Sequence, residues 1–142
     1  MTRRAVSREV REALDLWRRG LRECAARRGD RIVEQRHQKW IAFRSERQRR
    51  VFAEVRPSRR KLQVFLLPPL QELRDPLRLA RVAPRSQGWN WFRTKLTVVG
   101  NGPARAALAL IEQSYEKGPA KARTRRASRS RTRQSRLPTG TG

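Results

Sequence analysis

Two side chains in the sequence are of the types that most often act as catalytic bases or nucleophiles. His37 is the only histidine, and it lies in the polar run Gln35–Lys39, which predicts an exposed strand edge. Cys24 is the only cysteine, and a thiol nucleophile needs a base beside it. The spacing of Cys24 on an apolar helical stripe predicts a small core residue instead. Neither residue therefore predicts an enzyme.

The acidic residues do not form a metal-dependent catalytic motif. A restriction-type nuclease needs an acidic residue on one strand and Glu-x-Lys on the next, to hold Mg²⁺ and position water. The nearest strings are Glu34–Arg36 and Glu54–Arg56, where arginine replaces lysine, and Asp30 is the only acidic residue that precedes them as a ligand. One cysteine and one histidine cannot make a zinc site, and Gly100–Gly102 lacks the lysine of a phosphate-binding loop. The sequence predicts no metal and no cofactor.

The dominant chemical feature is positive charge. The 142 residues contain 36 Lys plus Arg and 12 Asp plus Glu, a net charge of +24, and all but five of the basic residues are arginine. Arginine donates paired hydrogen bonds to phosphate and stacks on bases, although a codon bias toward arginine would give the same excess. A surface of this charge attracts polyanions, and nucleic acid is the first candidate.

Basic residues gather around two short polar connectors, 45–50 and 57–60, where they could follow a phosphate backbone. A solvated basic surface is the alternative interpretation. The predicted phosphate contacts in the folded part are Arg44, Arg47, Arg49, Arg50, Arg56, Arg59, Arg60 and Lys61.

Aromatic residues suggest two further sites. Trp89, Trp91 and Phe92 lie beside Arg85 and Arg93, and they could stack unpaired bases or simply fill the core. A small-ligand pocket is a separate hypothesis, and it would be formed by Trp40, Phe52, Glu54 and Trp89.

Among the elements expected to position these residues, the first along the chain is an N-terminal helix. Apolar residues recur every three or four positions from Val6 to Cys24, which predicts an amphipathic helix over about 7–28 within a segment 1–29. Ser7 suits the N-cap and Gly29 the C-terminal stop, while Gly20 weakens the helix locally. No apolar run approaches the length of a membrane span.

Segment 30–116 predicts an α+β domain. Strands are expected at 40–44, 51–56, 61–67 and 93–99, and the short connectors make the first three consecutive and antiparallel. Val51, Ala53 and Val55 should alternate with Phe52, Glu54 and Arg56 on opposite faces. A short helical turn is expected near 77–82, and Pro103 should open a second long helix. The prediction is a small antiparallel sheet of about four strands with both helices on one face.

The last segment, 117–142, has the composition of a disordered basic tail. It has nine basic residues, no acidic residue, and Ser, Thr, Gly and Pro between them, so it cannot bury enough apolar surface to offset its ordering entropy. A flexible cationic arm gains affinity by releasing counterions from a polyanion. The tail residues predicted to contact nucleic acid are Arg123, Arg125, Arg126, Arg129, Arg131 and Arg133.

A set of strand and helix cores between about residues 21 and 116 resembles a bacterial family, the domain of unknown function 5655, whose members are often labelled "predicted transport protein". The resemblance rests on Trp40–Arg44, Val51–Pro57, Lys61–Leu66, Leu73–Pro76 and Leu110–Glu116. It implies the fold and no mechanism, and near Trp89 a glycine-rich turn of the family is replaced by Asn90-Trp91-Phe92. Its members also occur joined to nuclease-like modules, which associates the family with nucleic acid.

Three functions follow as hypotheses. The first is an accessory module in the cytoplasm that binds DNA or RNA without sequence preference, through its loops and tail. The second is a protein-interaction module whose basic surface meets an acidic partner, such as a nuclease or modification enzyme. The third is a small-ligand domain or enzyme with a pocket around Trp40. If the basic residues gather on one face of the folded domain, selection for binding explains the arginine excess better than codon bias does.

Overall fold

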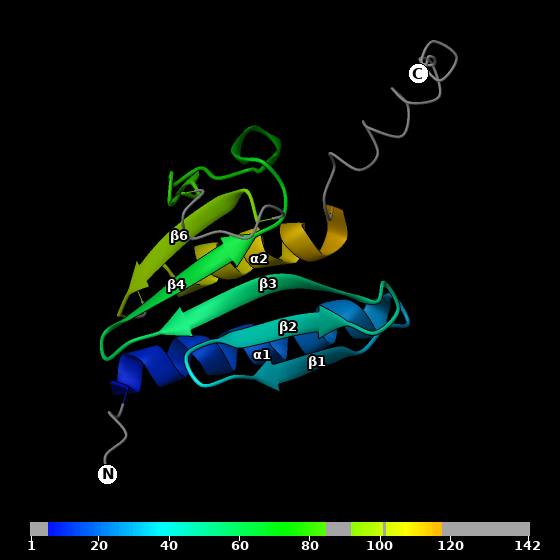
Figure 1. Cartoon of the computed structure of the whole chain (residues 1–142), viewed down its shortest axis with the longest axis horizontal. Helices are drawn as coiled ribbons and strands as arrows, with labels where there is room; N and C mark the ends of the chain where they lie inside the picture. The colour runs from blue at the N-terminus through cyan, green and yellow to red at the C-terminus, as the bar shows by residue number, and fades with distance from the viewer. Residues whose placement is uncertain (1–5, 85–91, 101, 118–142) are drawn as a thin grey trace, which may run out of the picture.

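The computed structural model describes residues 6–84, 92–100 and 102–117. They form a six-stranded antiparallel sheet of order β1-β2-β3-β4-β6-β5, with two helices on one side of it (Figure 1). The expectation of an antiparallel α+β sheet with an N-terminal and a C-terminal helix is confirmed, but the number of strands, about four, is wrong. Residues 118–142 of the predicted tail, and Arg85, Trp89 and Trp91 of the predicted stacking site, lie outside the described residues, whereas Lys117 is the last residue of the C-terminal helix.

Helix α1 (Arg8–Arg27) forms where the apolar period predicts it, and its two ends use local hydrogen bonds. The Ser7 side chain accepts a hydrogen bond from the backbone N–H of Val10, as an N-cap residue does. At the other end Gly29 has φ +69°, and its N–H and that of Asp30 donate to Ala26 and Ala25. This left-handed glycine stop directs the chain into the sheet and fixes the position of Asp30.

The sheet begins with a chain of three hairpins. Strands β1 (Ile32–Arg36), β2 (Ile41–Ser45), β3 (Arg50–Pro57) and β4 (Lys61–Leu66) pair consecutively and antiparallel. Strand β6 (Thr94–Val99) then pairs with β4, and the short β5 (Ala80–Val82) lies at the far edge. A one-turn helix, η1 (Leu70–Glu72), lies between β4 and β5.

The two strands missing from the sequence prediction have weak signals. Strand β1 contains only two apolar residues, Ile32 and Val33, so its alternation is too short to recognise. Strand β5 has three residues and lies where a helical turn near 77–82 is expected. That expectation is wrong because Asp75 accepts hydrogen bonds from the N–H groups of Leu79 and Ala80, which leads the chain from a turn into pairing with β6.

A β-bulge in β3 corrects the predicted alternation. Phe43 pairs with Ala53 and Arg44 with Val51, so Phe52 is an extra residue. Its ring lies 5.1 Å from that of Tyr115, on the helix side of the sheet and not with Glu54 and Arg56. The Phe52 carbonyl accepts a hydrogen bond from the fully buried hydroxyl of Ser114.

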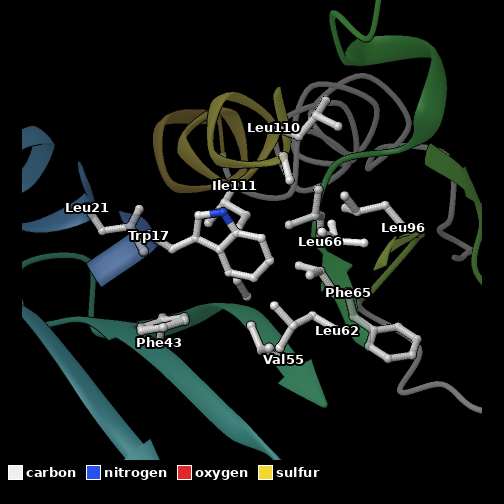
Figure 2. Close-up of a cluster of buried hydrophobic side chains, with 14 of the residues drawn as sticks. Trp17, Leu21, Phe43, Val55, Leu62, Phe65, Leu66, Leu96, Leu110 and Ile111 are labelled. Carbon is white, nitrogen blue, oxygen red and sulfur yellow. The ribbon is translucent and has the colours of Figure 1, made fainter. Parts of the chain in front are cut away.

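The core lies between the sheet and the two helices. Helix α2 (Ala104–Lys117) contributes Leu110 and Ile111 to the same buried cluster as Trp17 and Leu21 of α1, and Ile111 lies beside Trp17 (Figure 2). Trp17 is fully buried, and its indole Nε1–H donates to the carbonyl oxygen of Ala104 at 2.9 Å. The helices approach each other closely at Gly20, where an added Cβ would lie 2.5 Å from Leu108. Cys24 is buried, as predicted for a core residue.

Candidate nucleic-acid interface

The strand pairing separates the sheet into two faces. Residues such as Phe43, Val55, Val64 and Leu96 share the face that packs on the helices, and they are buried. The residues between them point to the opposite side, where the described residues place no helix (Figure 1). We call this the helix-free face.

The helix-free face carries charges of nearly one sign. Its only acidic residue in the described strands is Glu54, which is 4% exposed. The two helices, in contrast, mix signs, with acidic residues at Glu9, Glu12, Asp15, Glu23, Glu112 and Glu116. The basic residues that point to the helix-free face from the strands are Arg44, Arg56, Lys61, Arg81 and Lys95.

The predicted basic cluster is divided by this arrangement. Arg44, Arg56 and Lys61 belong to the helix-free face, but Arg50 pairs with Ser45 on the helix side and is partly buried. Burial lowers the pKa of Arg50. A single cluster is therefore not formed, because strand β3 separates the two connectors.

The loop arginines lie at opposite ends of β3. Arg59 and Arg60 are exposed in the connector between β3 and β4. Arg47 and Arg49 are exposed in the connector between β2 and β3, where Arg47 also donates to the Arg28 carbonyl oxygen at 2.5 Å. Of the two connectors, the one between β3 and β4 leads directly into Lys61 and therefore lies beside the helix-free face.

A ladder of rings and one guanidinium crosses the helix-free face. The rings of His37 and Trp40 stack at 4.9 Å with their planes 25° apart. The Arg56 guanidinium carbon lies 5.9 Å from the Trp40 ring centroid and 5.1 Å from that of Phe65, and Phe65 lies 6.4 Å from Phe92. These are distances at which arginine and aromatic rings attract each other. We call these five residues the stacked ladder.

The two ends of the stacked ladder differ in exposure. Phe65 and Phe92 are 1% and 6% exposed, so they form its buried base. Trp40 is partly exposed and His37 is exposed, so the accessible end is in the β1–β2 turn. Arg56 connects the two ends, with 31% of its side chain exposed, and it contacts Glu54 at 3.4 Å. Its Nε is buried and lacks a hydrogen-bond partner within the described residues. The rings of Trp40 and Phe65 therefore hold Arg56 together with its ion pair to Glu54.

The predicted ligand pocket does not assemble as proposed. Trp40 and Glu54 share the helix-free face, but Phe52 faces Tyr115 on the other side of the sheet because of the bulge. Trp89 lies outside the described residues. Trp40 does line a groove, but its other walls come from α1 and the β1–β2 turn, and neither Phe52 nor Glu54 is among them.

Asp30, the one acidic residue placed before the Glu-x-Arg strings, has a structural role. Its Oδ2 accepts hydrogen bonds from Ser45 Oγ at 2.5 Å and Tyr115 OH at 2.7 Å. Its Oδ1 accepts from the N–H groups of Arg31 and Arg47. Burial alone would raise the pKa of Asp30, but these hydrogen bonds lower it to about 2. The carboxylate thus joins the segment before β1 to β2, to the β2–β3 connector and to α2, a role that sequence reasoning missed.

Two general properties follow from the described parts of the chain. No group of three or more His, Cys, Asp or Glu side chains there is arranged to hold a metal ion. Neither described helix combines the length and the apolar character needed to cross a membrane.

Comparison of the chain with protein-family models, with curated proteins and with solved structures gives no match. The resemblance to the domain of unknown function 5655 family therefore stays a prediction.

Proposed function

We propose that the protein is a module that binds single-stranded nucleic acid without sequence preference, through the helix-free face. The observation that carries the proposal is the separation of charge. The strand residues of this face offer basic side chains and one buried carboxylate, whereas the helices mix acidic and basic residues. A codon bias alone gives no reason for acidic residues to avoid one face.

The stacked ladder favours a single strand over a duplex. Proteins that bind single strands combine a basic surface, which follows the phosphates, with rings on which bases stack, and stacking contributes about 1–3 kcal/mol per base. At the accessible end of the ladder His37, supported by the Trp40 ring on which it stacks, supplies such a stacking group. Stacking tolerates every base, so the expected binding is broad and depends steeply on salt.

The direct test compares two variants of the full chain that lose the same charge. In the face variant Arg44, Arg81 and Lys95 are replaced by Gln, and in the control variant the exposed helix residues Arg19, Arg22 and Arg105 are replaced by Gln. Both keep the tail, so its contribution cancels. The measurement is the anisotropy of a labelled 20-nucleotide single strand over a salt series, with DNA and RNA tested separately.

The expected result is a shallower salt dependence for the face variant only. Each phosphate contact on a single strand contributes about −0.7 to the log–log slope, so losing three contacts should reduce the slope by about 2. Equal slopes for the face and control variants would show that the helix-free face does not contact phosphates. Polyglutamate of matched length tests the alternative of an acidic protein partner, and equal displacement by it would argue against a stacking contribution.

A further inference from the structure

The accessible end of the stacked ladder opens into a basic groove. The groove has a volume of about 820 Å³ and lies between the first half of α1 and the β1–β2 turn. Its walls include four basic residues, Arg11, Arg18, Arg36 and Lys39, together with His37 and Trp40. None of the described residues that line it is acidic.

Two of the four arginine and lysine side chains are held in place by one carboxylate behind the groove. Arg18 donates from Nε and Nη2 to the two oxygens of Glu34, at 2.8 and 2.9 Å. Arg36 donates from Nε to Glu34 Oε2 at 3.2 Å. The hydrogen bonds with Glu34 raise the pKa of Arg18; burial would raise the pKa of Glu34, but Arg18 and Arg36 lower it overall. The carboxylate therefore fixes two guanidinium groups at the wall.

Part of this positive charge remains directed outward. Arg36 uses only Nε for Glu34, and its side chain is 68% exposed, so its two terminal amino groups are available within the described residues. Arg11 and Lys39 are exposed. A site with several fixed and flexible cations suits a phosphate with two negative charges better than the single charge of an internal phosphodiester.

The rings define where a base would lie. One face of Trp40 meets His37 and Arg56 lies over the same ring, so Trp40 is already stacked. His37 is the last ring of the ladder, and it is exposed in the turn where the sheet ends. A base that continues the ladder therefore stacks on the outer face of the His37 imidazole.

From these observations we propose that the groove binds a phosphomonoester beside a base, as found at the phosphorylated end of a single strand or in a free nucleoside monophosphate. The base stacks on His37, and the phosphate contacts Arg11, Arg36 and Lys39. The proposal deepens the proposed function and rests on it. In this arrangement the groove is the point at which a bound nucleic-acid strand leaves the helix-free face of the sheet.

The test uses the full chain and single strands that differ only at one end. Oligonucleotides carry a 5′-phosphate, a 3′-phosphate or two hydroxyl ends, with the fluorophore always at the end opposite to the phosphate. The groove variant replaces Arg11 and Lys39 by Gln, which leaves the Glu34 ion pairs intact, and the matched control replaces Arg19 and Arg22 by Gln. His37→Ala and His37→Phe separate loss of the ring from retention of a stacking surface.

We expect wild-type protein to bind one phosphorylated end about tenfold more tightly than the hydroxyl end, the size of a charge-assisted contact. This preference should disappear in the groove variant and in His37→Ala, and persist in the control and in His37→Phe. No preference in wild-type protein, or an equal loss in the control, would overturn the groove proposal. If the hydroxyl strand still binds with steep salt dependence, the proposed function stands without it.

Competition identifies the source of the phosphate. Adenosine monophosphate and inorganic phosphate are each added to the complex of wild-type protein with the phosphorylated strand. If adenosine monophosphate displaces the oligonucleotide and binds as tightly as the oligonucleotide does, the groove is a site for free nucleotides. If no oligonucleotide binds at all, the proposed function fails. A direct titration with the mononucleotide then supports the groove if binding requires Arg11 and Lys39, and overturns it if there is no binding.

Discussion

Replacing Asp30 by Asn should destabilise the fold at neutral pH. Its carboxylate accepts four hydrogen bonds, and the two residues that donate from hydroxyl groups, Ser45 and Tyr115, are both buried. Asparagine keeps the size, but it replaces one accepting oxygen with a donating NH₂ group and removes the charge. Depending on which oxygen is replaced, either Ser45 and Tyr115 or the N–H groups of Arg31 and Arg47 then face a donor in place of their acceptor.

The magnitude follows from the pKa of Asp30. Lowering a carboxyl pKa from 3.8 to about 2 corresponds to about 2.4 kcal/mol of stabilisation. Asp30 is partly exposed, so solvent screening reduces the expected contribution to about 1–2 kcal/mol. The pKa is lowered in the folded state, so this contribution is complete above pH 4 and is lost as the pH falls toward 2.

The assay is urea unfolding at several pH values between 2 and 7, for wild type, Asp30→Asn and a control. Asp15→Asn is the control, because Asp15 is 63% exposed and makes an ion pair with Arg18 that should contribute only a few tenths of a kcal/mol. The gap between wild type and Asp30→Asn should narrow as the pH falls from 4 to 2. An Asp30→Asn chain as stable as wild type at pH 7, or a gap that does not change with pH, would refute the role assigned to the carboxylate.

Three further predictions concern the packing of the helices. Gly20→Ala should raise stability by clearly less than the about 1 kcal/mol expected from helix propensity, because the new Cβ meets a methyl group of Leu108 at 2.5 Å and that side chain must move. In a Leu108→Ala background the full gain of about 1 kcal/mol should appear, and a double-mutant cycle by urea unfolding measures the difference, whose absence would show that the two residues do not interact. Trp17→Phe should lower the free energy of unfolding by about 1–3 kcal/mol, because the buried carbonyl oxygen of Ala104 loses the indole N–H that donates to it. A loss below about 0.5 kcal/mol in the same assay would show that this hydrogen bond contributes little. Burial raises the pKa of Cys24, so iodoacetamide at pH 8 should label folded protein far more slowly than protein in urea, and equal rates would show that the thiol is accessible.

The elements with a strong local signal could be predicted from the sequence. Helix α1 follows from its apolar period and from Ser7 and Gly29 at its ends, and strands β2, β3, β4 and β6 follow from runs of β-branched and aromatic residues. Strands β1 and β5 could not be predicted, because their pairing is set by partners elsewhere in the chain. Gly20 looked like a weak point of the helix, and only the packing of α2 explains it.

The candidate interface could be predicted only in part. Arg44, Arg56 and Lys61 were expected as phosphate contacts, and Trp40 and Glu54 as one site, and they do share the helix-free face. That they share a face depends on the register of three hairpins, which a one-residue bulge at Phe52 changes. The contributions of Arg81 and Lys95 were missed because they lie on strands that pair out of sequence order.

The role of Asp30 could not be predicted because its donors come from three separate segments. Ser45 lies in β2, Arg47 in the connector that follows it, and Tyr115 in α2, 85 residues after Asp30. No local pattern connects these residues. The only signal near Asp30 was the glycine stop before it, which indicates a turn and not a hydrogen-bonded centre.

The most direct test of the helix-free face is an NMR titration of ¹⁵N-labelled full-length protein with an unlabelled single-stranded oligonucleotide at moderate salt. We expect the amide signals of Arg44, Arg56 and Lys95 to shift together with the side-chain signals of Trp40, while those of Arg19 and Arg105 on the exposed sides of the helices stay in place. Shifts of equal size on the helices and on the helix-free face, or shifts confined to residues beyond Lys117, would show that the helix-free face is not the binding surface.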